Sequence, residues 1–245
     1  MTRLRDSQKG SIFFVILLAV AMFGMLSYAV SQGSRSSASS LTREQVRTAA
    51  QEAISYGNAI QKAVATLRLR GCSDTQLDFT NGGKSRRGNG GAYDYTNPNS
   101  PDDDSCDVFS MSGGKVTPQF LSSGYVDSGS VNPAFMDVRS FVVTATRMAG
   151  LGQDSGAEGT DLIIWLGRLQ PEVCMAINDL LGVTNPSDAP PVDDFDCDGT
   201  IFQGAYTSCS NAVGELPELT GKSAYCSGYN DSGPMYNYFQ VLVVR

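Results

Sequence analysis

The stretch LTREQVRTAAQEAISYGNAIQKAVATLRLRG, Leu41–Gly71, predicts a long amphipathic helix. Thr42 and Gln45 have the spacing of a capping box at its start, and Gly71 supplies a stop. Apolar or small residues recur at steps of three and four, which places them on one face. The residues of this face are Val46, Ala50, Ala53, Gly57, Ile60, Val64 and Leu67. Small side chains allow a close approach, so the face suits the chain's own sheet, neighbouring helices, or both.

A polar segment and an apolar segment precede this helix. Residues 31–40, SQGSRSSASS, have weak helical preference and no apolar face, so we expect helix to loosen or break there. Residues 11–30 carry no charge, and a helix of that length at about 1.5 Å per residue spans the ~30 Å of bilayer hydrocarbon. The apolar run is longer than the roughly 7 to 15 residues of a secretory signal. We therefore expect a retained membrane anchor.

The charges before the apolar run set its expected orientation. Arg3, Arg5 and Lys9 stand against one acid, Asp6, and such a basic flank stays in the cytoplasm. The chain after Val30 is then exported. Its six cysteines all follow the apolar run, and an even number in an exported domain predicts three disulfides whose pairing the sequence leaves open. The cysteines are Cys72, Cys106, Cys174, Cys197, Cys209 and Cys226.

Beyond Gly71 the sequence predicts a loop-rich domain built on a sheet. Residues 72–118 are dominated by Gly, Ser, Asn and Asp, which is typical of a long loop. Strands are predicted at 138–148, 160–169, 200–207 and 235–245, the first two as antiparallel neighbours. A short helix is predicted from Pro171 to its terminator Gly182. The expected fold class is α+β, with a long N-terminal helix packed on a small antiparallel sheet stapled by disulfides.

The composition excludes several kinds of chemistry. The chain has no histidine, which removes the usual general base, imidazole-dependent triads and c-type haem attachment. There is no CxxC pair to suggest zinc. A net charge of −7 over 245 residues disfavours binding to nucleic acid phosphates. We therefore expect neither an enzyme nor a nucleic-acid-binding protein.

One motif indicates a metal. Asp194, Asp196 and Asp198, followed by Gly199, match the opening half of a calcium loop, D-x-D-x-D-G. Ala205 stands at the twelfth loop position, where an EF-hand has a bidentate glutamate. Two interpretations stay open. Either calcium binds with further carboxylates, such as Asp193 or those at 102–104, or the segment is a solvated acidic turn fixed by a disulfide of Cys197.

Taken together, the first ~70 residues resemble type IV pilins and pseudopilins. The resemblance is carried by the basic leader, the junction Lys9, Gly10 and Ser11, the apolar run and the helix after it. It implies that prepilin peptidase removes residues 1–10, a cytoplasmic leader, between Gly10 and Ser11. The new amine at Ser11 is then expected to be methylated, solvated or paired with a backbone carbonyl.

The same resemblance implies how the chain is organised. The helix would have a membrane half at 11–30, which becomes the core of a helical filament, and an amphipathic half at 41–70. The linker at 31–40 would melt as subunits leave the inner membrane, and residues 71–245 would form the exported globular domain. The expected core residues are Ile12, Phe13, Phe14, Val15, Leu17, Leu18, Phe23 and Leu26.

The sequence departs from the family pattern near the expected start of the mature chain, and alternatives therefore stay open. Most bacterial pilins have glutamate at the fifth mature position, where this chain has Val15, and Ser11 replaces the usual phenylalanine or methionine. The first expectation is a structural subunit of an extracellular pilus-like filament at the cell surface. The alternatives are a single-pass membrane protein with an exported binding domain, a minor pilin or pseudopilin of a secretion system, and an exported enzyme that uses carboxylates.

Overall fold

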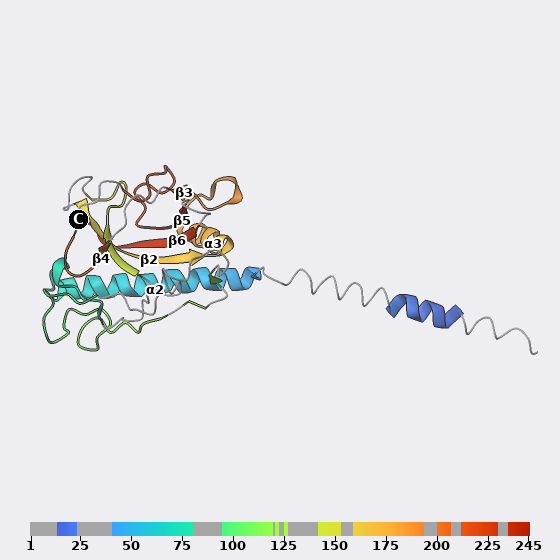
Figure 1. Ribbon diagram of the computed structural model, residues 1–245, viewed down its shortest axis with the longest axis horizontal. Helices are drawn as coiled ribbons and strands as arrows, with labels where there is room; N and C mark the ends of the chain where they lie inside the picture. The colour runs from blue at the N-terminus through green and yellow to red at the C-terminus, as the bar shows by residue number, and fades with distance from the viewer. Residues whose placement is uncertain are drawn as a thin grey trace, which may run out of the picture. The chain divides into compact units, whose positions relative to one another are not determined.

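A computed structural model describes most of the chain and divides it into two units, Met1–Thr42 and Arg43–Arg245. In the first unit, residues 14–23 form a helix, drawn in dark blue in Figure 1. The remaining elements belong to the second unit. The described residues are 14–23, 41–80, 95–119, 121–122, 125–126, 142–152, 159–193, 200–206, 212–229 and 235–245.

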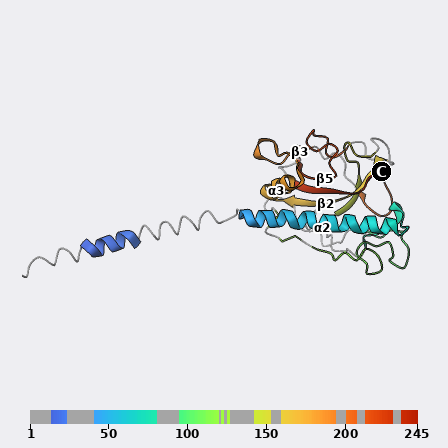
Figure 2. The same cartoon turned by 180° about the vertical axis from the view of Figure 1, so that it is seen from behind.

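Helix α2, Arg43–Leu69, occupies the range predicted to be helical. It runs along one side of the sheet in both views (Figures 1 and 2). Apart from the half-buried Val46, every residue of the predicted stripe is buried, and Ala49, Tyr56 and Ala63 widen the buried face. This face packs into a core shared with the sheet. The small residues therefore serve the chain's own helix–sheet contact.

In the described part of the chain, the sheet has six strands in the order β3-β5-β6-β2-β1-β4. Four of the five pairings are antiparallel, whereas β3 and β5 pair in parallel. The strands are β1 Val142–Thr146, β2 Asp161–Leu169, β3 Val192–Asp193, β4 Thr200–Ile201, β5 Ala224–Tyr229 and β6 Met235–Val243. The prediction of an antiparallel sheet is therefore wrong. The sheet is mixed because the Pro- and Asp-rich stretch between α3 and β4 adds β3 as a parallel edge strand.

The apolar run of β2 is explained by cores on both sides of the sheet. Leu162 and Ile164 pack in the core that includes α2. Ile163 lies in a second core with Val213 and Tyr225. A central strand buried on both faces shows a continuous apolar sequence instead of alternation. This is why the LIIWL sequence was a clear strand signal.

Helix α3, Pro171–Leu181, ends as predicted at Gly182, which adopts the left-handed conformation (φ 67°). Cys174 of α3 forms a disulfide with Cys226 of β5, and a second disulfide joins Cys72 and Cys106. Two disulfides are thus present in the described part of the chain. Cys197 and Cys209 lie outside the described residues, so the third disulfide stays a prediction.

The expected long N-terminal helix with a membrane half is also wrong for the described chain. The helix at 14–23 has ten residues, which extend about 15 Å against ~30 Å of hydrocarbon. Among the described residues, no helix combines the length and the apolar character needed to cross a bilayer. The leader at 1–10 and the linker at 31–40 lie outside the described residues.

Candidate functional site on an apolar helix

The helix at residues 14–23, FVILLAVAMF, is apolar on every side. Its eight large apolar side chains are all more than half exposed, from 51% at Leu18 to 76% at Phe23. A helix with apolar residues all around is normally buried in a protein core or a membrane. A continuous exposed apolar surface of this kind marks a site of contact with protein or lipid.

The free energy available from covering this helix is large. Full burial of one Val, Leu, Ile, Phe or Met side chain stabilises by about 1.5–3 kcal/mol. Eight such side chains correspond to a gain on the order of 10–20 kcal/mol, before the entropic costs of association. Covering these side chains, whether by lipid or by protein, is therefore favourable.

The structure places five of the predicted core residues on this helix: Phe14, Val15, Leu17, Leu18 and Phe23. The prediction omitted Ile16, Val20 and Met22, which are just as exposed. The same uninterrupted apolar run in the sequence would have identified these three residues as well. The remaining predicted residues lie outside the described residues, and these are Gly10, Ser11, Ile12, Phe13 and Leu26.

The predicted calcium ligands Asp194, Asp196 and Asp198 also lie outside the described residues. Of the carboxylates considered as further ligands, Asp193 accepts the main-chain N–H of Gly214 at 2.5 Å. Asp103 accepts the N–H of Ser105 at 3.0 Å, and hydrogen bonds from Ser105 lower the pKa of Asp103. No group of three metal-binding side chains is found within the described ranges. Calcium binding stays a prediction.

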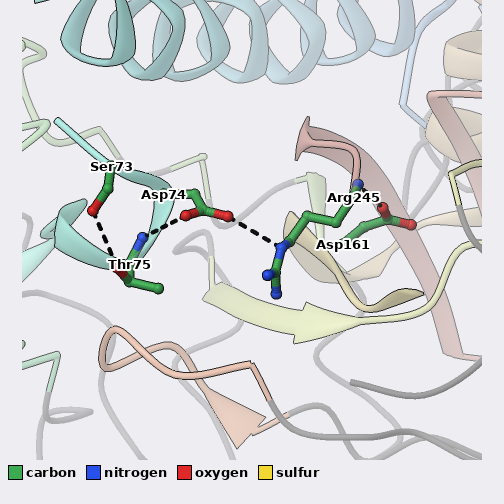
Figure 3. Close-up of polar contacts among 5 residues, drawn as sticks. All are labelled: Ser73, Asp74, Thr75, Asp161 and Arg245. Atoms are coloured by element: carbon green, nitrogen blue, oxygen red, sulfur yellow. Dashed lines mark hydrogen bonds and ion pairs between the residues drawn. The ribbon is translucent and has the colours of Figure 1, made fainter. Parts of the chain in front are cut away.

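A second cluster, which the sequence did not predict, surrounds Asp161 at the start of β2 (Figure 3). Asp161 is fully buried. Its Oδ2 accepts the N–H of Met148 at 3.1 Å, and its Oδ1 accepts the N–H of Arg245 at 3.0 Å. The Arg245 side chain turns to Asp74 in the short helix η1, Asp74–Gln76, with 3.1 Å from Nε to Oδ2. Its guanidinium also lies 4.0 Å from the ring centroid of Tyr206.

The chain matches no protein-family model, no curated protein and no solved structure.

Burial dominates the electrostatics of the Asp161 cluster. Loss of water raises the pKa of Asp161 to about 6, although the N–H groups of Arg245 and Met148 and the charge of Arg245 act in the opposite direction. Burial and the nearby charge of Asp74 also raise the pKa of Tyr206. The Tyr206 hydroxyl is buried and finds no hydrogen-bond partner among the described residues. The cluster joins residues far apart in sequence, so no spacing pattern could have indicated it.

Proposed function

We propose that this chain is a structural subunit of an extracellular type IV pilus-like filament. It would be held in the inner membrane before assembly and in the filament afterwards by the apolar residues at 14–23 and their apolar sequence neighbours. The observation that carries the proposal is the helix at 14–23, whose large side chains are all more than half exposed. A basic, glycine-ended leader precedes it in the sequence.

Self-association explains how such a helix could leave the membrane. Lipid covers its apolar side chains before assembly. Leaving the lipid would expose them to water, at a cost of about 1.5–3 kcal/mol for each large residue. Equivalent helices from other copies restore the cover and add no new polar surface. Extraction from the membrane would therefore be coupled to polymerisation.

Two features of the second unit bear on the proposal, one on export and one on where copies contact each other. The disulfides Cys72–Cys106 and Cys174–Cys226 are typical of proteins in an oxidising compartment. The small-residue face of α2 is already covered by the chain's own sheet. Contacts between copies in the filament are therefore assigned to the helix at 14–23. We propose no catalytic role, because the chain has no histidine.

The proposal includes prepilin peptidase and the pilus assembly machinery as partners. Cleavage after Gly10 would leave Ser11 as the first residue. Mass spectrometry of the surface protein is expected to find a chain that begins at Ser11, with or without a methyl group. An intact Met1–Gly10 leader on the assembled protein would contradict this step.

A charge within the helix at 14–23 tests the proposal. Leu17→Lys should reduce incorporation into filaments roughly 100-fold, because lysine at the centre of an apolar helix costs about 3 kcal/mol. Ala59→Lys is the matched control, since Ala59 is exposed on α2, and it should leave the yield unchanged. The yield is measured by immunoblot and negative-stain microscopy of sheared surface fractions. Equal yields from wild type and Leu17→Lys would overturn the proposal.

One observation favours a second candidate. Val15 has no carboxylate to pair with a neighbour's amine, which suits a single-pass membrane protein whose exported domain binds a ligand as a monomer. In that case the protein would stay in the membrane fraction after shearing, with no filaments that label with an antibody against it. The shearing experiment therefore distinguishes the two candidates directly.

A further inference from the structure

We propose that an exported thiol–disulfide isomerase is a partner of this chain, because the Cys174–Cys226 disulfide encloses two other cysteines. Cys197 and Cys209 lie between the two bonded residues in the sequence. The inference rests on the export step of the proposed function and is independent of filament formation.

The order of export favours a wrong partner for Cys174. A chain that follows its N-terminal anchor out of the cytoplasm presents Cys197 29 residues before Cys226, an interval of about 1.5–6 s at the rate of synthesis. Disulfides form within seconds when a suitable oxidant is supplied. Cys197 is also nearer, at 23 residues from Cys174 against 52 for Cys226, which favours the shorter loop about threefold in an unfolded chain. The first disulfide of Cys174 is therefore a non-native one with Cys197.

The folded structure brings Cys226 to Cys174 only late. Cys226 belongs to β5, which lies between β3 and β6 in the sheet. Strand β6 follows β5 in the chain, so β5 has no antiparallel partner until the last residues are exported. The two hydrogen bonds between Asn178 and the main chain of Cys226 also need β5 in place. The native spacing of 5.3 Å between the Cα atoms of Cys174 and Cys226 is thus reached after the wrong pair has had time to form.

The wrong pair has to be corrected before folding is complete. Cys174 and Cys226 are both 0% exposed in the folded chain, so the thiol of another protein cannot reach their sulfur atoms there. In the incompletely folded chain, a thiolate of the isomerase attacks Sγ of Cys174, and the Cys197 thiolate leaves. The Cys226 thiolate then attacks the same Sγ and releases the isomerase. Each attacking thiol loses a proton and each leaving thiolate gains one, so no oxidant or reductant is consumed.

The other described disulfide supplies an internal control. Cys72 and Cys106 are successive cysteines in the sequence, so oxidation in the order of export joins them correctly. Their surroundings are also local. The N–H of Asp78 donates to the carbonyl of Cys106 at 3.0 Å, and the N–H of Val108 donates to the carbonyl of Asp78 at 2.9 Å. This disulfide should therefore form without an isomerase.

Expression of the full-length chain in bacterial cells with and without their exported disulfide isomerase tests the proposal. Free thiols are alkylated minutes after induction, before misfolded chain is degraded, and unreduced peptides are quantified by mass spectrometry. Without the isomerase, the fraction of chain with Cys174–Cys226 should fall at least about threefold, whereas the fraction with Cys72–Cys106 should stay unchanged. Equal Cys174–Cys226 fractions in the two hosts, or a parallel loss of both disulfides, would overturn the proposal. Absence of both disulfides from both hosts would contradict the export step, and this inference with it.

Two double variants identify the cause of the dependence. Cys197→Ser with Cys209→Ser removes both competitors, so the Cys174–Cys226 disulfide should then form equally with and without the isomerase. Cys72→Ser with Cys106→Ser is the matched control, because it also removes two cysteines but leaves the competitors, and the dependence should remain. If the first variant still needs the isomerase, competition by the enclosed cysteines is not the cause and the proposal fails.

Discussion

At the scale of single residues, Gly57 of α2 lies closely against Gln240 of β6. Gln240 is 2% exposed. Its Oε1 accepts the hydroxyl of Tyr238 at 2.6 Å, and its Nε2 donates to Asn58 at 2.9 Å. A Cβ atom at residue 57 would clash with that Oε1. The glutamine can move aside only by giving up these hydrogen bonds.

Gly57→Ala is therefore expected to destabilise the protein, although alanine is the better helix former. Overpacking costs about 1–3 kcal/mol, which exceeds the gain of about 0.5–1 kcal/mol from helix propensity. Urea denaturation measures the free energy of unfolding. Ser55→Ala, at an exposed position of α2, serves as the control and should not destabilise. If Gly57→Ala is just as harmful in a Gln240→Ala background, the clash is not the cause.

At the scale of elements, local signals predicted some parts of the fold and missed others. Helix α3 was predicted from Pro171 and Gly182, because both act within their own turn of helix. Strand β5, AYCSGY, was missed because glycine and serine weaken its β-propensity. Its place is set instead by pairing with β6 and by the disulfide from Cys226 to Cys174. Such distant partners leave no mark in a local sequence pattern.

Two kinds of bond tie α3 to β5 at the same residue. Besides the disulfide, Asn178 donates to the carbonyl of Cys226 at 2.9 Å and accepts its N–H at 2.8 Å. The side chain of Asn178 thus acts in place of a neighbouring strand. Because the asparagine lies one helical turn after Cys174, both attachments come from one face of α3.

The double replacement Cys174→Ser and Cys226→Ser should cost about 2–4 kcal/mol, mainly by freeing the unfolded chain. Cys72→Ser with Cys106→Ser should cost a similar amount, because the sequence separations of 52 and 34 residues enter only through their logarithm. Thermal unfolding under oxidising conditions gives both values. A cost well below 1 kcal/mol for the first pair would contradict this prediction.

At the scale of the whole molecule, apolar burial and apolar exposure are separated along the chain. Every buried side chain in the described part lies between Arg43 and Arg245, whereas the exposed large apolar residues are concentrated at 14–23. The apolar site could be predicted from sequence because its signal is continuous. The Asp161 cluster could not, since its members at 74, 161, 206 and 245 meet only in the folded chain.

This separation predicts the behaviour of a chain that lacks residues 1–42. Exported to an oxidising compartment, residues 43–245 should fold with both described disulfides and an unchanged melting temperature, because the two described cores are retained. They should also remain monomeric without detergent, since the surface that needs covering is gone. Light scattering after size exclusion measures the mass, and the full-length chain is expected to associate or to require detergent. Association of the shortened chain to the same degree would place the contact surface on the second unit and not on the helix at 14–23.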